Sequence, residues 1–171
     1  VLSSLKSRIA PKSFMNGFSA SATWTNRFLF IHPEKIEALA IGGFNGKLIL
    51  PQNEINGIKL NYPIGTNDFT GLFGIRFDMA TYKSIPQFIY MGKLDENDAV
   101  QFDDAYGENE RKIINDNIGR TVQERYLECQ KIYRENNISP AFKTYESIGH
   151  WTTPAINLEV IKFFFRQMQA K

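Results

Sequence analysis

Short apolar runs typical of buried strands alternate along this chain with segments of helical periodicity. The strand-like runs cover residues 12–18, 35–43, 86–92 and 141–147, and in the segments between and after them apolar residues recur three and four positions apart. Strands separated by helices are joined by crossovers into a parallel sheet, because a tight hairpin cannot contain a helix. The sequence therefore predicts an α/β fold, a mostly parallel sheet with helices on both faces.

The order of the strands in this sheet follows from chain connectivity. Sequential strands tend to be neighbours, and each crossover is right-handed, so we expect the four strands to lie side by side in chain order. The segment 44–74 is rich in Gly, Asn and Pro and reads as a hairpin-like excursion. With 171 residues in total, residues 1–171 are predicted to form a single domain that carries this excursion as an insert.

Composition removes several classes of function. The net charge is +2, and no basic stripe with interleaved aromatic residues is present, so a nucleic-acid partner is not expected. One cysteine, Cys129, permits neither an internal disulfide nor a Cys-x-x-Cys metal site, and its place on a helical apolar stripe predicts a core residue. No run of about 18 apolar residues occurs, so no membrane span is expected.

The six residues "NGFSAS" join the first predicted strand to the first predicted helix. Gly17, Ser19 and Ser21 recur at every second position, the spacing of a G-x-S-x-G turn that lifts a serine hydroxyl above a sheet. Such a turn places the next backbone N–H, that of Ala20, beside the attacked carbonyl at a helix N-terminus, where an oxyanion is favoured. A plain strand-to-helix junction with Ser21 near the N-cap is the alternative interpretation.

The other candidate site residues follow later strands. His150 stands between the last strand and the last helix, whereas His32 ends the first helix, where a structural role is expected. Asp95 lies three residues beyond the glycine that ends the third strand, and Asp98 is a competing acid. The order Ser19, Asp95, His150 is that of the Ser, acid and His residues in α/β-hydrolases.

These segments together resemble the α/β-hydrolase superfamily, esterase-like members in particular. The resemblance runs through "NGFSAS", "IPQFIYMGKLDENDAV", "RYLECQKIYRENNISPAFKTYESIGH" and "AINLEVIKFFFRQ", nearly the whole chain outside the excursion. It implies Ser19 as nucleophile, His150 as general base, Asp95 as the orienting acid and the Ala20 N–H as an oxyanion donor. It implies no cofactor and no metal, and a small ester-like substrate. The residues that flank the serine and the histidine, Phe18 and Trp151, are candidates for lining the substrate pocket.

The resemblance is to the C-terminal portion of such a fold. Ser21 stands where glycine is more usual, a small change because serine is also small. Only residues 1–11 precede the predicted elbow strand, so the earlier strands and the loop that supplies the second oxyanion N–H are not in this sequence. We therefore expect a missing N-terminal half of the domain, in the same or another chain, to be a partner of this one.

The sequence predicts a serine hydrolase that cleaves a carboxylic ester or a related acyl bond. The alternative is a non-catalytic binding or scaffold domain, because a fold alone does not establish an activity. A small acidic cluster, consisting of Asp103, Asp104, Glu108 and Glu110, matches no metal-binding loop and is interpreted as a solvated face.

Overall fold

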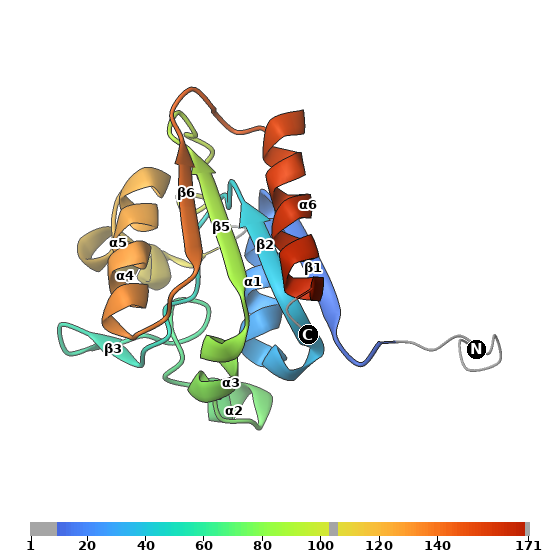
Figure 1. Ribbon diagram of the computed structural model, residues 1–171. Coiled ribbons are helices and arrows are strands. Elements are labelled where there is room, and N and C mark those ends of the chain that lie inside the picture. Colours follow the sequence, from blue (N-terminus) through green and yellow to red (C-terminus); the bar gives the residue numbers. More distant parts are fainter. Residues whose placement is uncertain (1–9, 103–105, 170–171) are drawn as a thin grey trace, which may run out of the picture.

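Four parallel strands form the central sheet of the protein, for which a computed structural model describes residues 10–102 and 106–169. They are β1 (Ser13–Phe18), β2 (Ile36–Gly42), β5 (Gln87–Gly92) and β6 (Ala141–Tyr145), and they lie in the order β1-β2-β5-β6. All three pairings are parallel, as Figure 1 shows. Both the strand order and the parallel sheet expected from the sequence are confirmed.

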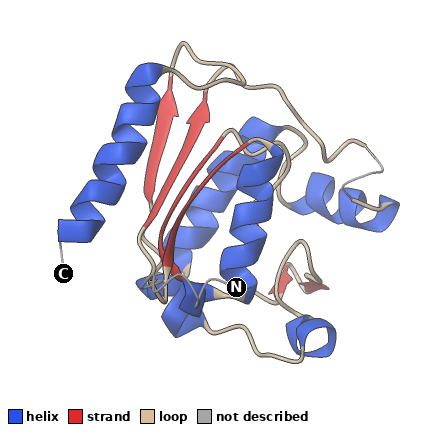
Figure 2. Ribbon diagram, turned by 90° about the vertical axis from the view of Figure 1, so that its right-hand side faces the viewer, coloured by secondary structure: helices blue, strands red, loops and turns tan. Residues whose placement is uncertain are grey.

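Helices cover both faces of this sheet. Figure 2 shows α6 (Pro154–Gln169) alone on one face, with α1 (Ala20–Ile31) and α5 (Val122–Glu135) on the other. Alternation along β2 divides the core accordingly, because successive side chains of a strand point to opposite faces. Leu39 and Ile41 belong to the larger cluster under α1 and α5, whereas Ala38 and Ala40 belong to the smaller cluster under α6.

The excursion between β2 and β5 packs into the larger core. It holds a two-stranded antiparallel hairpin of β3 (Glu54–Ile55) and β4 (Ile58–Lys59), followed by α2 (Phe69–Phe73). Leu48, Leu50, Leu60 and Phe69 of this segment are buried. In Figures 1 and 2 the hairpin lies well below the carboxyl ends of the sheet strands.

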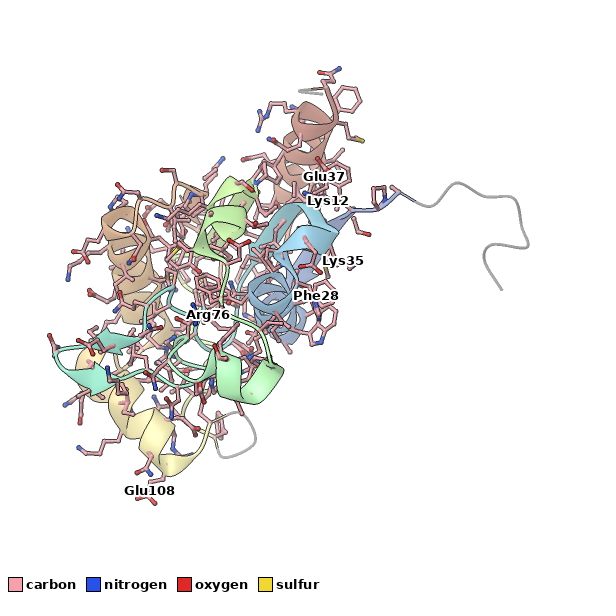
Figure 3. All side chains as sticks on the ribbon, turned by 90° about the horizontal axis from the view of Figure 1, so that it is seen from below. Lys12, Phe28, Lys35, Glu37, Arg76 and Glu108 are labelled. Carbon is pink, nitrogen blue, oxygen red and sulfur yellow. The ribbon has the colours of Figure 1, made fainter. Side chains whose placement is uncertain are left out.

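Three further elements complete the described part of the chain. A 3₁₀ helix, η2 (Pro33–Lys35), leads into β2, and α3 (Met79–Ser84) leads into β5. The helix α4 (Glu108–Asn117) was not expected from the sequence, and its first turn contains Glu108 and Glu110 of the predicted acidic cluster. Asp103 and Asp104 lie outside the described residues. Figure 3, seen from below, shows Lys12, Lys35 and Glu37 at the amino ends of β1 and β2, the edge opposite to the site described next.

Apolar side chains are exposed on β1 and on the outer side of α6. Within the described residues β1 pairs with β2 alone, and Phe14 on it is 38% exposed. The ring of Phe14 contacts that of Phe164, with centroids 5.4 Å apart. Four apolar side chains on one outer stripe of α6 are between 49% and 62% exposed. They are Leu158, Ile161, Phe165 and Met168. We call Phe14 and these four residues the outer apolar surface.

No helix of the described residues is both long enough and apolar enough to cross a lipid bilayer.

Candidate active site

Ser19 stands at the junction of β1 and α1 in a strained backbone conformation. Its φ is 59° and its ψ is −129°, a combination that L-residues rarely adopt and that costs about 1–3 kcal/mol. The Ser19 N–H donates to the Gly42 carbonyl at the end of β2, at 3.1 Å. The strain therefore stands at the one serine that the sequence singled out, above the carboxyl edge of the sheet.

The residues two positions before and after Ser19 make this turn possible. A Cβ on Gly17 would lie 2.5 Å from the Ser21 carbonyl oxygen and 2.7 Å from Thr25 Oγ1, so only glycine fits. Ser21 does more than stay small. Its Oγ accepts from the Phe18 N–H at 2.9 Å and donates to the Phe18 carbonyl at 2.7 Å, which clamps the turn. Sequence reasoning treated Ser21 only as a small residue and missed this clamp.

His150 reaches Ser19 from the loop between β6 and α6. Its Nε2 lies 2.8 Å from Ser19 Oγ, within hydrogen-bond distance, across 131 residues of sequence. The Phe18 ring packs against the imidazole, with ring centroids 5.0 Å apart. Nε2 can accept the serine proton only if the imidazole proton is on Nδ1, so the other partner of the ring decides the tautomer.

That partner is the carboxylate of Asp95. Both of its oxygens lie 3.0 Å from His150 Nδ1, and its side chain is 1% exposed. The carboxylate accepts the Nδ1–H and leaves Nε2 free to accept from Ser19. Asp98, the competing acid, lies elsewhere: it forms an ion pair with the buried guanidinium of Arg125 and accepts the Val100 N–H at 3.0 Å. Of the two acids, it is Asp95 that stands beside the imidazole.

Ala20 begins α1 directly after the serine. Its N–H has no acceptor among the described residues and belongs to the free N–H groups of a helix N-terminus, where negative charge is stabilised. Gly43, which follows β2, has a φ of 50° and passes close to the site. A Cβ on it would lie 2.6 Å from the Phe18 ring and 3.2 Å from Asp95 Oδ2, so glycine is required there.

The two candidate pocket residues differ in their surroundings. Phe18 is half-buried, with its ring against Gly43 and the His150 imidazole. Trp151 is 53% exposed beside His150 and packs over Gly149. Leu94, next to Asp95 at the same edge of the sheet, is 60% exposed, and sequence reasoning did not single it out. Trp151 and Leu94 are exposed apolar residues that directly follow His150 and precede Asp95 in the chain.

The remaining candidates lie away from this arrangement. Cys129 is buried in the larger core, and burial raises the pKa of its thiol to about 12, so it stays a neutral thiol. His32 caps the end of α1, with its N–H donating to the Phe28 carbonyl at 2.8 Å. Within residues 10–102 and 106–169, no three His, Cys, Asp or Glu side chains form a group that could hold a metal ion.

Comparison with known proteins places the fold among hydrolases. No protein-family model matches the sequence, and a search of curated proteins finds no match. Among solved structures, a poly(aspartic acid) hydrolase from Sphingomonas sp. KT-1 matches with a TM-score of 0.55 and 19% identity, covering 93% of this chain and 55% of that one. A poly(3-hydroxybutyrate) depolymerase from Bordetella parapertussis matches with a TM-score of 0.50 and 16% identity, covering 88% and 54%.

This chain thus spans about half the length of both structures. Identity this low shows a shared fold alone. The fold is an α/β fold with a mostly parallel sheet, found in two hydrolases.

Proposed function

We propose that this protein is a serine hydrolase that cleaves a carboxylic ester or a related acyl bond. The observation that carries the proposal is one continuous chain of contacts. Ser19 Oγ lies 2.8 Å from His150 Nε2, and His150 Nδ1 lies 3.0 Å from the buried Asp95 carboxylate. A nucleophile, a base and an orienting acid within hydrogen-bond reach of one another are the signature of an activated serine.

The proposed reaction begins with attack of Ser19 Oγ on the acyl carbon while His150 Nε2 takes the hydroxyl proton. The negative charge that develops on the carbonyl oxygen is stabilised by the Ala20 N–H and the N-terminus of α1. The tetrahedral intermediate collapses to an acyl-enzyme, and His150 gives its proton to the departing alkoxide. Asp95 stays ionised and stabilises the imidazolium throughout.

Water then attacks the acyl-enzyme in the same way. His150 takes a proton from the water, the second tetrahedral intermediate forms at the same oxyanion position, and its collapse returns the proton to Ser19 Oγ. The products are a carboxylic acid and an alcohol. No step requires a metal ion or an organic cofactor.

An ester is the proposed substrate class, with a thioester, peptide or carbohydrate ester as other acyl substrates. The names of the two structural neighbours point to one polyester and one poly(amino acid) as their substrates. The exposed Trp151 and Leu94 beside the triad offer apolar surface to an acyl chain. We therefore propose short-chain p-nitrophenyl esters and 3-hydroxybutyrate oligomers as the first substrates to test.

A fluorophosphonate probe tests the proposal directly. It should label the wild-type protein at Ser19, and neither Ser19→Ala nor denatured protein should be labelled. Ser84→Ala is the matched control, because Ser84 ends α3 with its hydroxyl bonded to the Thr81 carbonyl, before the amino end of β5 and so at the edge of the sheet opposite to the site. Absence of labelling in folded wild-type protein would favour the non-catalytic scaffold alternative, whereas weak ester hydrolysis alone would not, because the second proposal below also expects it.

We also propose that a further polypeptide segment completes the site. The outer apolar surface and the side of β1 that has no partner strand among residues 10–102 and 106–169 support this, because exposed strand edges and apolar patches mark places where other segments pair. The segment would pair along residues 14–16 and supply a second oxyanion N–H opposite Ala20.

Expression of the 171 residues alone tests this second proposal. The preparation should be poorly soluble and hydrolytically weak, and Ile161→Lys with Phe165→Lys on the outer apolar surface should raise its solubility without changing fluorophosphonate labelling. A soluble, monomeric and fully active wild-type preparation would refute the proposal.

A further inference from the structure

The loop that carries Asp95 is held from two sides by contacts outside itself. Within the loop, the Asp95 N–H donates to the Gly92 carbonyl at 3.1 Å, and Asp95 Oδ1 accepts the Asn97 N–H at 3.0 Å. These bonds shape the turn but do not fix its place relative to His150. The position of the turn relative to His150 depends on hydrogen bonds from other segments of the fold.

The first set of these hydrogen bonds joins the acid loop to the segment that leads into His150. The Lys93 N–H donates to the Tyr145 carbonyl and the Leu94 N–H donates to the Ile148 carbonyl, both at 2.9 Å. These bonds extend the pairing of β5 and β6 beyond the strand ends. A shift of the acid loop is therefore transmitted to the backbone that leads into His150.

The second set comes from a single side chain, that of Gln123 in the first turn of α5. Its Nε2 donates to the Gly92 carbonyl at 2.9 Å and to the Asp95 carbonyl at 2.8 Å. Both amide hydrogens of the half-buried side chain are thereby used, and the two acceptors are the carbonyls at the start of the turn and at the acid itself. Gln123 spans 28 and 31 residues of sequence to reach them.

The helix turn that carries Gln123 is itself anchored. Thr121 and Glu124 form a capping box at the start of α5. Two residues beyond Gln123, the Arg125 guanidinium is 1% exposed and donates to the Gly46 carbonyl at 3.0 Å and to the Gly119 carbonyl at 3.2 Å, besides its ion pair with Asp98. Gln123 therefore projects from a fixed platform, which is what a group that positions another residue requires.

We propose that Gln123 is a positioning residue that fixes the Asp95 carboxylate against His150 Nδ1 and so holds the imidazole in line with Ser19. The inference rests on the proposed hydrolase function. Gln123 touches neither substrate nor reacting atoms; it acts through the backbone of the acid loop. Removing its donors lets the carboxylate drift, and a misplacement of about 1 Å in such a site costs on the order of 100-fold in rate.

The test compares variants of Gln123 in steady-state hydrolysis of a p-nitrophenyl ester. Gln123→Met removes both donors at similar volume and should lower kcat by about 10- to 100-fold with KM changed less than about twofold. Gln123→Lys, which restores a donor, should recover most of kcat. Gln101→Met is the matched control: Gln101 Nε2 also donates to a backbone carbonyl, that of Arg120 at 3.1 Å, but to none of the acid turn.

A proton NMR measurement separates positioning from mere stability. The His150 Nδ1–H resonance should lie far downfield in the wild-type protein, should shift or broaden in Gln123→Met, and should stay in place in Gln101→Met. If Gln123→Met does not fold, Gln123→Leu, which also removes the donors and adds no charge, takes its place in both measurements.

The outcomes distinguish the two proposals. A Gln123→Met enzyme with wild-type kcat and an unmoved Nδ1–H resonance overturns the inference and leaves the hydrolase function standing. Activity that survives Ser19→Ala overturns the hydrolase function instead, and the resonance still reports whether Gln123 holds Asp95 against His150.

Discussion

The two sides of the candidate active site are built in opposite ways. The side of Ser19, the proposed nucleophile, is local: the strained φ of Ser19, the position that only glycine fits at Gly17 and the Ser21 clamp on Phe18 all lie within residues 17–25. The acid and base side is assembled from distant segments, because His150 lies 55 residues from Asp95 and 131 residues from Ser19.

Because of this difference, we expect the two sides to respond differently to substitutions elsewhere in the fold. A local turn keeps its geometry as long as its own few residues and the end of β2 are intact. The acid and base side depends on the pairing of β5 with β6 and on α5, so substitutions remote from the chemistry reach it.

Ser19→Ala should lower kcat by about three or more orders of magnitude, because the nucleophile is lost while alanine tolerates the turn no worse than serine. Ser19→Gly should be equally inactive but more stable than Ser19→Ala by about 1 kcal/mol, since glycine adopts the positive φ without strain. Ester hydrolysis and thermal unfolding of the two variants measure the two effects. Equal stability of the two would mean that the elbow is not strained.

Asp95→Asn should lower kcat by about three to four orders of magnitude, because an amide favours the wrong imidazole tautomer. Asp98→Asn should lower kcat less than tenfold and instead destabilise the fold by about 1–3 kcal/mol, since Arg125 is buried and loses its charged partner. Kinetics and urea unfolding of both variants give the comparison. If Asp98→Asn proved the more damaging to kcat, Asp98 would be the acid.

Ser21→Ala should lower kcat by about tenfold, because the clamp consists of two hydrogen bonds of about 0.5–1.5 kcal/mol each that hold the strained turn. Ser84→Ala, which removes a hydroxyl-to-carbonyl bond on α3, is the matched control and should leave kcat unchanged. An unchanged kcat in Ser21→Ala would mean that the turn holds itself without the clamp.

Lys47 belongs to neither side of the site. We expect it to make the free energy of unfolding depend on pH and to leave kcat unchanged. Its Nζ donates to the Leu48 and Ile64 carbonyls, and burial lowers its pKa to about 7. Between about pH 7 and its ordinary pKa, the unfolded chain binds a proton there that the folded protein does not, so this residue makes stability rise with pH. The unfolding free energy of wild type minus that of Lys47→Met should rise with pH, by about 0.7 kcal/mol per pH unit near pH 7 and by about 1.4 kcal/mol per pH unit between pH 8 and 9. A difference independent of pH would show that Lys47 stays charged.

Sequence reasoning predicted the local features and the topology well, for a physical reason. Strand and helix patterns depend on neighbouring residues, so the four strands, their order and the buried stripe of α5 that includes Tyr126 and Cys129 are confirmed. The turn around Ser19 is likewise a property of adjacent residues. The catalytic roles of Ser19, Asp95 and His150 stay predictions until activity is measured.

Contacts between distant segments could not be predicted from the sequence. Nothing near Gln123 in the sequence indicates that its amide meets the turn of Asp95, because that meeting depends on how α5 packs on the sheet. The helix α4 was missed because its 10 residues are mostly polar, which gave it the look of a solvated loop. The outward apolar stripe of α6 was also missed, since its residues interleave with the buried stripe in a single apolar run.

The contact between Ser19 and His150 joins residues near opposite ends of the chain, 131 positions apart. Loop-closure entropy opposes a contact between residues so far apart until intervening structure shortens the loop, so we expect it to form after the local helices and the strand pairs between them. The hydroxyl therefore gains its base only when the whole sheet is in register. A nascent, nicked or partly unfolded chain holds an ordinary serine, so covalent labelling of Ser19 would report the fraction of molecules that have finished folding.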